Sequence, residues 1–166
     1  MSLYVLTGLP GSGKTTALAC GLAGRSDVGG FLSPLRNNRR WFYLIRTKEW
    51  LPMEWEGQSD SEVLEVGRYV FLKSAFALAL SALERDFKLG VKNLVLDEFG
   101  PLERMGKGLM PGVEGILKEV QNSDRQHLVV VIRSLLLDEF LRSFPLAVTA
   151  SISDWNADLN ARFFQS

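Results

Sequence analysis

The fold is decided by Gly8-Leu9-Pro10-Gly11-Ser12-Gly13-Lys14-Thr15-Thr16, a stretch that follows an apolar run and precedes a helix-forming one. The stretch matches the pattern G-x-x-x-x-G-K-[ST], and the order strand, glycine loop, helix is that of a phosphate-binding loop. Glycines are needed because the chain must turn its N–H groups inward and adopt backbone conformations that other residues avoid. The sequence therefore predicts a site for the phosphates of a nucleotide.

Each position of this loop has an expected role. Lys14 is expected to act in catalysis as a point charge on the β- and γ-phosphates, Thr15 to offer its hydroxyl to Mg²⁺, and Thr16 to reach the α-phosphate. The helix that begins near Gly13 aims its positive end at the same charge. The residues predicted to contact the nucleotide are Gly8, Gly11, Ser12, Gly13, Lys14, Thr15 and Thr16.

Composition restricts the class of protein. The 166 residues are enough for one domain with a buried core, which we expect to span 1–166, and too few for two nucleotide-binding halves. Hydrophobic residues make up 46% and charged residues 23%, as in ordinary globular proteins. Because 19 basic residues balance 19 acidic ones, the net charge does not indicate a nucleic-acid partner.

The single cysteine and the apolar runs bear on location. Cys20 excludes an internal disulfide framework, and we expect it to be a small core residue of the first helix rather than a nucleophile. The N-terminal residues show no signal-peptide pattern, and the longest apolar stretches are much shorter than a membrane span. These features predict a cytoplasmic protein with no membrane contact.

Periodicity predicts alternating strands and helices. Strands are expected at 3–6, 28–33, 40–46, 69–71, 91–98, 126–132 and 147–149, and helices from Gly13 to about 21–24 and at 74–87, 113–121 and 135–144. A last helix is expected after a cap at Asp154 or Asn156. Residues 36–53 are expected to form a hairpin insertion, and a further hairpin plus a loop is expected between residues 48 and 66. The fold class predicted is α/β, with a mostly parallel central sheet and helices on both faces.

An apolar strand ending in Asp97-Glu98 supplies the second half of the site. Asp97 is expected to hold Mg²⁺ opposite Thr15, and Glu98 to accept a proton from the water that attacks the γ-phosphate. A strand ending in two acids is a weak signal alone. It becomes strong here because it follows a phosphate-binding loop with a whole βα unit between them.

Each basic residue near the predicted site either contacts the phosphates or lies on the surface without a role in the reaction. Arg133 ends the apolar strand at 126–132, where it either faces the phosphates and stabilises charge as the γ-phosphate leaves, or lies on the surface. The hairpin arginines either reach the triphosphate or keep an exposed edge soluble. These hairpin residues are Arg36, Arg39, Arg40 and Arg46.

A family resemblance rests on further stretches: Gly30-Phe31-Leu32-Ser33-Pro34 leading to Arg36, Gly67-Arg68-Tyr69, and Asp97-Glu98-Phe99-Gly100-Pro101-Leu102-Glu103. With the glycine loop, they resemble the small P-loop nucleoside-triphosphatases, whose animal members are called cancer-related nucleoside-triphosphatases and which also occur in thermophilic microbes. The last stretch is the most specific, because it is similar to that family's Asp-Glu-Ile-Gly-Pro-Met-Glu-Leu block. The resemblance extends over most of the chain.

This resemblance implies a RecA-like three-layer core and slow, Mg²⁺-dependent hydrolysis of several nucleoside triphosphates, ATP and GTP among them, to diphosphate and phosphate. By position, Lys14, Thr15, Asp97 and Glu98 inherit the phosphate, metal and water-activating roles. The chain departs from the family where an acidic residue usually follows Pro34 and where a Gly-Phe step usually follows the basic hairpin. Leu35 and Trp41-Phe42 stand at those places.

Two other functions remain open at this stage. A nucleotide or small-molecule kinase would use the same glycine loop, although such kinases usually carry an arginine-rich lid, and the later arginines here are scattered in the sequence. A nucleotide-dependent switch or adaptor would bind without appreciable turnover, with the glycine-rich loop at 106–112 as a movable part. The sequence leaves base preference, oligomeric state and any activating partner open.

Overall fold

The computed structural model describes residues 2–57 and 62–164. Its strands are β1 (Leu3–Gly8), β2 (Val28–Leu32), β3 (Leu35–Arg36), β4 (Arg39–Leu44), β5 (Glu49–Pro52), β6 (Val63–Val66), β7 (Tyr69–Leu72), β8 (Asn93–Phe99), β9 (His127–Arg133) and β10 (Val148–Ser151). Eight of them form one sheet in the order β10-β1-β9-β8-β2-β4-β3, with β5 paired to β4, while β6 and β7 form a separate hairpin.

The sheet is parallel on one side and antiparallel on the other. The pairs that join β10, β1, β9, β8 and β2 are all parallel. The pairs made by β4 with β2, β3 and β5 are antiparallel. The predicted parallel sheet with a hairpin insertion is therefore what the chain forms.

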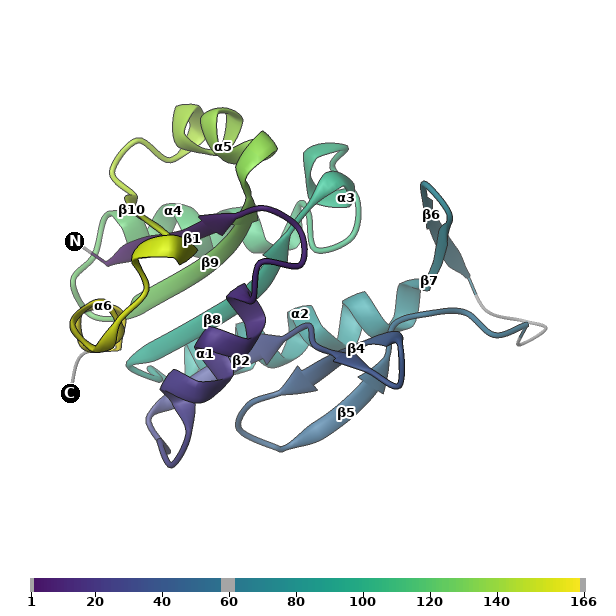
Figure 1. Ribbon diagram of the computed structural model, residues 1–166, viewed down its shortest axis with the longest axis horizontal. Helices are drawn as coiled ribbons and strands as arrows, with labels where there is room; N and C mark the ends of the chain where they lie inside the picture. Colours follow the sequence, from purple (N-terminus) through teal and green to yellow (C-terminus); the bar gives the residue numbers. More distant parts are fainter. Residues whose placement is uncertain (1, 58–61, 165–166) are drawn as a thin grey trace.

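Helices cover both faces of the sheet (Figure 1). They are α1 (Lys14–Leu22), α2 (Lys73–Lys88), α3 (Pro101–Arg104), α4 (Gly112–Gln121), α5 (Leu137–Ser143) and α6 (Ala157–Phe163), with 3₁₀ turns at Ser134–Leu136 and Ile152–Asp154. Side chains alternate across the sheet, so Leu3 and Val5 join the core under α2, α4 and α5, whereas Tyr4 and Leu6 join the core under α1 and α6. The result is three layers.

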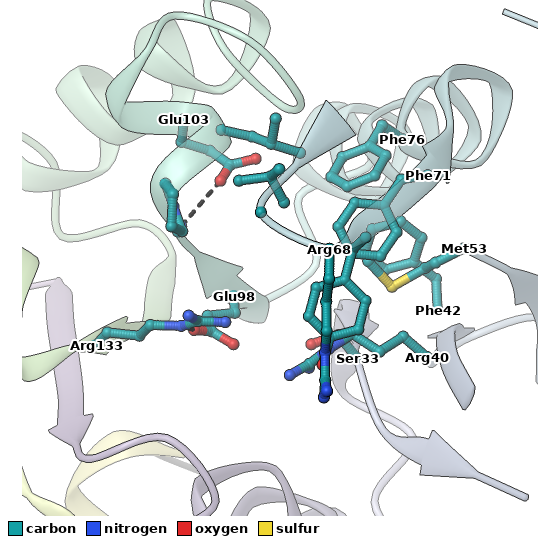
Figure 2. Close-up of a pocket in the computed structure, with 16 residues that line it drawn as sticks. Ser33, Arg40, Phe42, Met53, Arg68, Phe71, Phe76, Glu98, Glu103 and Arg133 are labelled. Carbon is teal, nitrogen blue, oxygen red and sulfur yellow. Dashed lines mark hydrogen bonds and ion pairs between the residues drawn. The ribbon is translucent and has the colours of Figure 1, made fainter. Parts of the chain in front are cut away.

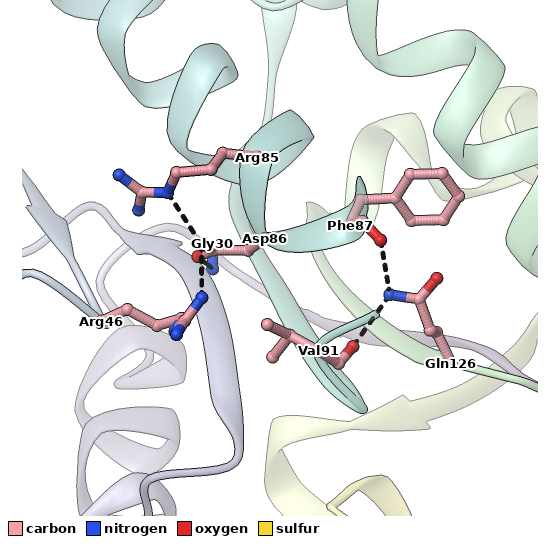
Figure 3. Close-up of polar contacts among 7 residues, drawn as sticks. All are labelled: Gly30, Arg46, Arg85, Asp86, Phe87, Val91 and Gln126. Carbon is pink, nitrogen blue, oxygen red and sulfur yellow. Dashed lines mark hydrogen bonds and ion pairs between the residues drawn. The ribbon is translucent and has the colours of Figure 1, made fainter. Parts of the chain in front are cut away.

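Gly30 and Asp86 hold α2 close to the sheet (Figure 3). Gly30 has φ +86°, and a Cβ there would lie 2.0 Å from the carbonyl oxygen of Val95 on the neighbouring strand. The fully buried carboxylate of Asp86 accepts the Gly30 N–H at 2.9 Å and is flanked by Arg46 at 3.4 Å and Arg85 at 3.1 Å. These contacts satisfy a charge that would otherwise be costly to bury.

Some sequence expectations need correction. Cys20 is exposed on α1 rather than buried in the core, because α1 turns Leu18 and Leu22 toward the sheet. Strand β4 ends at Leu44, before the expected Arg46. Of the further hairpin and loop expected up to 66, residues 58–61 lie outside the described part of the chain, and Val63–Val66 is strand β6, which pairs with β7. Among the helices of the described residues, none has the length and apolar character needed to cross a membrane.

Candidate functional site

The glycine loop connects β1 to α1 in the conformation that its glycines permit. Gly11 and Gly13 have φ of +72° and +89°, a region that side chains disfavour. Gly8 is required for a different reason, because a Cβ there would lie 2.6 Å from Ile152 Cγ2. The loop is therefore specified by backbone geometry at these positions.

The loop presents backbone N–H groups to an anion. The first helical bond of α1 runs from the Ala17 N–H to the Gly13 carbonyl at 2.9 Å. The N–H groups of Lys14, Thr15 and Thr16 thus precede the first N–H that is bonded within the helix, and they lie at the positive end of its dipole. This end of α1 is suited to bind a phosphate.

Lys14 is folded across the loop that carries it. Its Nζ donates to the Gly8 carbonyl at 3.1 Å and to the Leu9 carbonyl at 2.8 Å, and the side chain is largely buried. Burial lowers the pKa of Lys14, and the negative charges of Glu98 and Asp97 oppose that change. The ammonium group therefore lies within the field of both acids.

Thr15 and Asp97 meet at the carboxyl end of β8. The Thr15 hydroxyl donates to Asp97 Oδ2 at 2.7 Å, and the backbone N–H of Ser33 donates to the same oxygen at 3.0 Å. Burial raises the pKa of Asp97 to about 6, although both hydrogen bonds favour the charged form. The second oxygen, Oδ1, is buried and has no hydrogen-bond partner among the described residues. An unpartnered carboxylate oxygen beside a hydroxyl is a suitable ligand set for a hard cation.

A cation at this point would share its ligands with the substrate. In residues 2–57 and 62–164, no group of three or more His, Cys, Asp or Glu side chains could hold a metal ion. P-loop sites need fewer protein ligands, because the phosphates and water complete the coordination shell. The pair Thr15 and Asp97 fits that arrangement.

Glu98 and Arg133 form an ion pair across neighbouring strands. The Arg133 Nε donates to Glu98 Oε1, and both side chains are partly buried. In the register of the sheet, Arg133 lies opposite Gly8, the first residue of the glycine loop. The arginine at the end of β9 is thus beside the phosphate-binding loop rather than on a remote surface.

Two cavities adjoin these residues. The larger, of about 1230 Å³, extends from the glycine loop and α1 to the hairpin β4–β5. The smaller, of about 290 Å³, lies between the end of β8, α3 and the hairpin β6–β7. Both are lined by Ser33, Arg40, Glu98 and Arg133 (Figure 2 shows the smaller). Of the residues predicted to contact the nucleotide, all except Gly8 line the larger cavity.

Sequence reasoning did not identify two contributors to this region. Ser33 contacts Asp97, and its position just after β2 was the available signal, because parallel strands collect their carboxyl ends at one edge. Glu103 accepts the N–H of Gly100 at 2.9 Å and of Leu109 at 3.1 Å. The proline two residues before it, with a glutamate at the third helical position, was the signal for a helix start.

Together, strand β1, which leads into a glycine loop, and strand β8, which lies one strand further along the sheet and carries two acids at its carboxyl end, define the class of P-loop nucleoside-triphosphatases. The model of an NTPase family matches residues 3–157. The chain belongs to this NTPase family, and it is a P-loop nucleoside-triphosphatase.

Solved structures show the same fold. THEP1 from the hyperthermophile Aquifex aeolicus has a TM-score of 0.70 and 22% identity, over 94% of this chain and 92% of that one. A human cancer-related nucleoside triphosphatase has a TM-score of 0.65 and 19% identity, over 98% of this chain and 94% of that one. A search of curated proteins finds no match. The predicted P-loop fold and family are confirmed.

Proposed function

We propose that the protein hydrolyses nucleoside triphosphates, including ATP and GTP, to diphosphate and phosphate in a Mg²⁺-dependent reaction. The observation that carries the proposal is the contact between Thr15 and Asp97, made beside Lys14 and Glu98 at one edge of the sheet. Glycine loops bind the phosphates that all nucleotides share, which supports a broad range of bases.

Thr15 and Asp97 are the residues that would hold Mg²⁺. The buried, unpartnered Oδ1 of Asp97 supports this assignment, because an orphaned charge is costly unless a cation or hydrogen bond compensates it. When bound, the ion neutralises charge on the β- and γ-phosphate oxygens.

The remaining side chains supply binding and proton transfer. Lys14 leaves the carbonyls of its own loop and contacts the β- and γ-phosphates, while the N–H groups that begin α1 bind the same anion. Glu98 accepts the proton of the attacking water. Arg133 orients that carboxylate through the ion pair and stabilises the charge that develops on the transferred phosphoryl group.

Phosphate release from ATP and from GTP, measured with Mg²⁺ and with EDTA, tests this proposal. We expect release to water alone for both nucleotides and loss of release in EDTA. Tight nucleotide binding with negligible release would favour a switch instead. Equal release with and without Mg²⁺ would contradict the metal assignment.

A further inference from the structure

The smaller cavity has an apolar wall of aromatic and thioether side chains. Phe42, Met53, Phe71 and Phe76 form that wall and are each almost fully buried (Figure 2). Hydrolysis of a triphosphate by water does not need such a wall. A cavity of about 290 Å³ lies at the small end of the range for ligand sites, so it suits a molecule with one ring rather than a nucleotide.

Cationic groups occupy another side of the same cavity. Arg68 Nη2 donates to the Tyr69 hydroxyl at 3.0 Å, and the guanidinium groups of Arg68 and Arg40 lie 5.1 and 5.8 Å from the centre of the Tyr69 ring. Across the parts of the chain that the structure describes, neither arginine forms an ion pair with a carboxylate. This side therefore attracts an anionic group on a ligand.

The cavity also opens on the residues that the hydrolysis uses. Glu98 and Arg133 line both cavities, so the proposed base lies at their junction. Its carboxylate can therefore be approached from the nucleotide side and from the smaller cavity. A hydroxyl held in the smaller cavity would occupy the position of the attacking water.

We propose that the smaller cavity binds a small aromatic alcohol that carries an anionic substituent, and that this alcohol accepts the γ-phosphoryl group. The proposal rests on the proposed function, because it uses the same nucleotide site and the same Glu98. The alcohol oxygen bonds to the γ-phosphorus while the bond from that phosphorus to the β,γ-bridging oxygen breaks. The alcohol proton passes to Glu98, and a nucleoside diphosphate and a phosphate ester leave.

Arginines that are distant in the sequence lie around the smaller cavity. The arginines that follow Glu98 are scattered along the sequence, whereas kinases usually carry an arginine-rich lid. In the fold, Arg133 lies with Arg40 and Arg68 around one cavity, although the three come from distant segments. A group of arginines thus lines the same cavity as Glu98 without an arginine-rich lid.

The test uses the full chain with ATP and Mg²⁺, and ³¹P NMR to separate phosphate ester from inorganic phosphate. The probes are 3-(hydroxymethyl)benzoate, neutral benzyl alcohol and cationic 3-(aminomethyl)benzyl alcohol. We expect ester from the anionic probe, less from the neutral one and least from the cationic one. Benzoate, which has no alcohol group, should compete with the anionic probe and yield no ester.

Arg68→Ala removes an exposed cation that has no part in the proposed hydrolysis, and Arg142→Ala removes an exposed cation on α5 as the matched control. We expect Arg68→Ala to lower ester formation from the anionic probe about tenfold, the effect of losing one charged contact, while release to water is unchanged. Arg142→Ala should change neither product.

Continued release to water with no ester from any probe would overturn the acceptor proposal and leave hydrolysis standing. An equal ester yield from all three probes, or an equal loss in both arginine variants, would also overturn it. Absence of both products in the wild-type protein would instead refute the proposed function, and the acceptor role with it.

Discussion

Thr15 on α1 and Asp97 at the end of β8 are 82 positions apart in the sequence and are joined by a hydrogen bond of 2.7 Å. The contact links the phosphate-binding loop to the acidic strand end. In the part of the chain that the structure describes, the other, buried oxygen of Asp97 has no hydrogen-bond partner.

Asp97→Asn keeps the size of the side chain and removes the charge that a Mg²⁺ ligand needs. We expect Mg²⁺-dependent phosphate release to fall at least about 100-fold, because the metal no longer stabilises the charge that develops in the transition state. The fold should remain, since a neutral amide is cheaper to bury than a carboxylate. Asp158→Asn, at an exposed position of α6, is the matched control. Unchanged release in Asp97→Asn would remove Asp97 from the metal site.

Glu98→Gln leaves a group of the same shape that does not accept the proton of water. Phosphate release should fall by about 10²–10⁴-fold, the usual contribution of a general base. Nucleotide affinity, measured by calorimetry, should stay within about threefold, because the phosphate contacts are made by other residues. Glu119→Gln on the exposed face of α4 controls for loss of a surface charge. Full activity in Glu98→Gln would assign the base elsewhere.

Lys14→Ala should weaken triphosphate binding itself. Losing one charged hydrogen-bond donor to a phosphate should lower affinity for ATP about 10- to 100-fold. ADP should be affected less, because it lacks the γ-phosphate. Titration of the variant with each nucleotide measures both effects, and Lys88→Ala, exposed at the end of α2, is the control. An affinity equal to that of the unmodified protein would count against the site.

Glu103 should make stability depend on pH. Burial raises its pKa to about 7 from 4.5, despite the two backbone N–H groups that favour the charged form. Between these values the folded state binds a proton that the unfolded state does not. The free energy of unfolding should therefore fall as pH rises through this window and level off above it.

Urea unfolding of the wild-type protein and of Glu103→Gln from pH 5 to 8 measures this dependence. The difference between the two curves isolates Glu103, since the contributions of Asp97 and His127 cancel. The difference should change with pH up to about 7 and then become constant. A difference that does not vary with pH would show that Glu103 keeps the same charge in both states.

Gly30→Ala should destabilise the fold strongly, by about 3 kcal/mol or more, because φ is positive and the methyl group would meet a carbonyl of β8. Gly115→Ala is the matched substitution on α4, where, among the described residues, no atom outside the adjoining helix backbone lies within 4 Å of the added Cβ. That change should stabilise the protein by up to about 1 kcal/mol, since alanine favours a helix interior. Similar unfolding midpoints for the two variants would contradict both assignments.

Local patterns predicted much of this protein. The glycine loop, the apolar strands and the acidic strand end were recognisable because the backbone and side-chain chemistry that each requires is confined to neighbouring residues. The burial of Cys20 was predicted wrongly, because it depends on contacts between segments that are distant in the sequence. Which side of α1 faces the sheet depends on packing, and the short apolar pattern of that helix did not specify it.

The sequence by itself determined that the chain carries a phosphate-binding loop and a strand ending in two acids. Only the tertiary structure decided which residues surround them. The order β9-β8-β2 places Arg133 on one side of the acids and Ser33 on the other. The hairpin insertion adds Arg40, and the separate β6–β7 hairpin adds Arg68. Strand order arises from packing between distant segments, so no single stretch of the sequence predicts which residues surround the site.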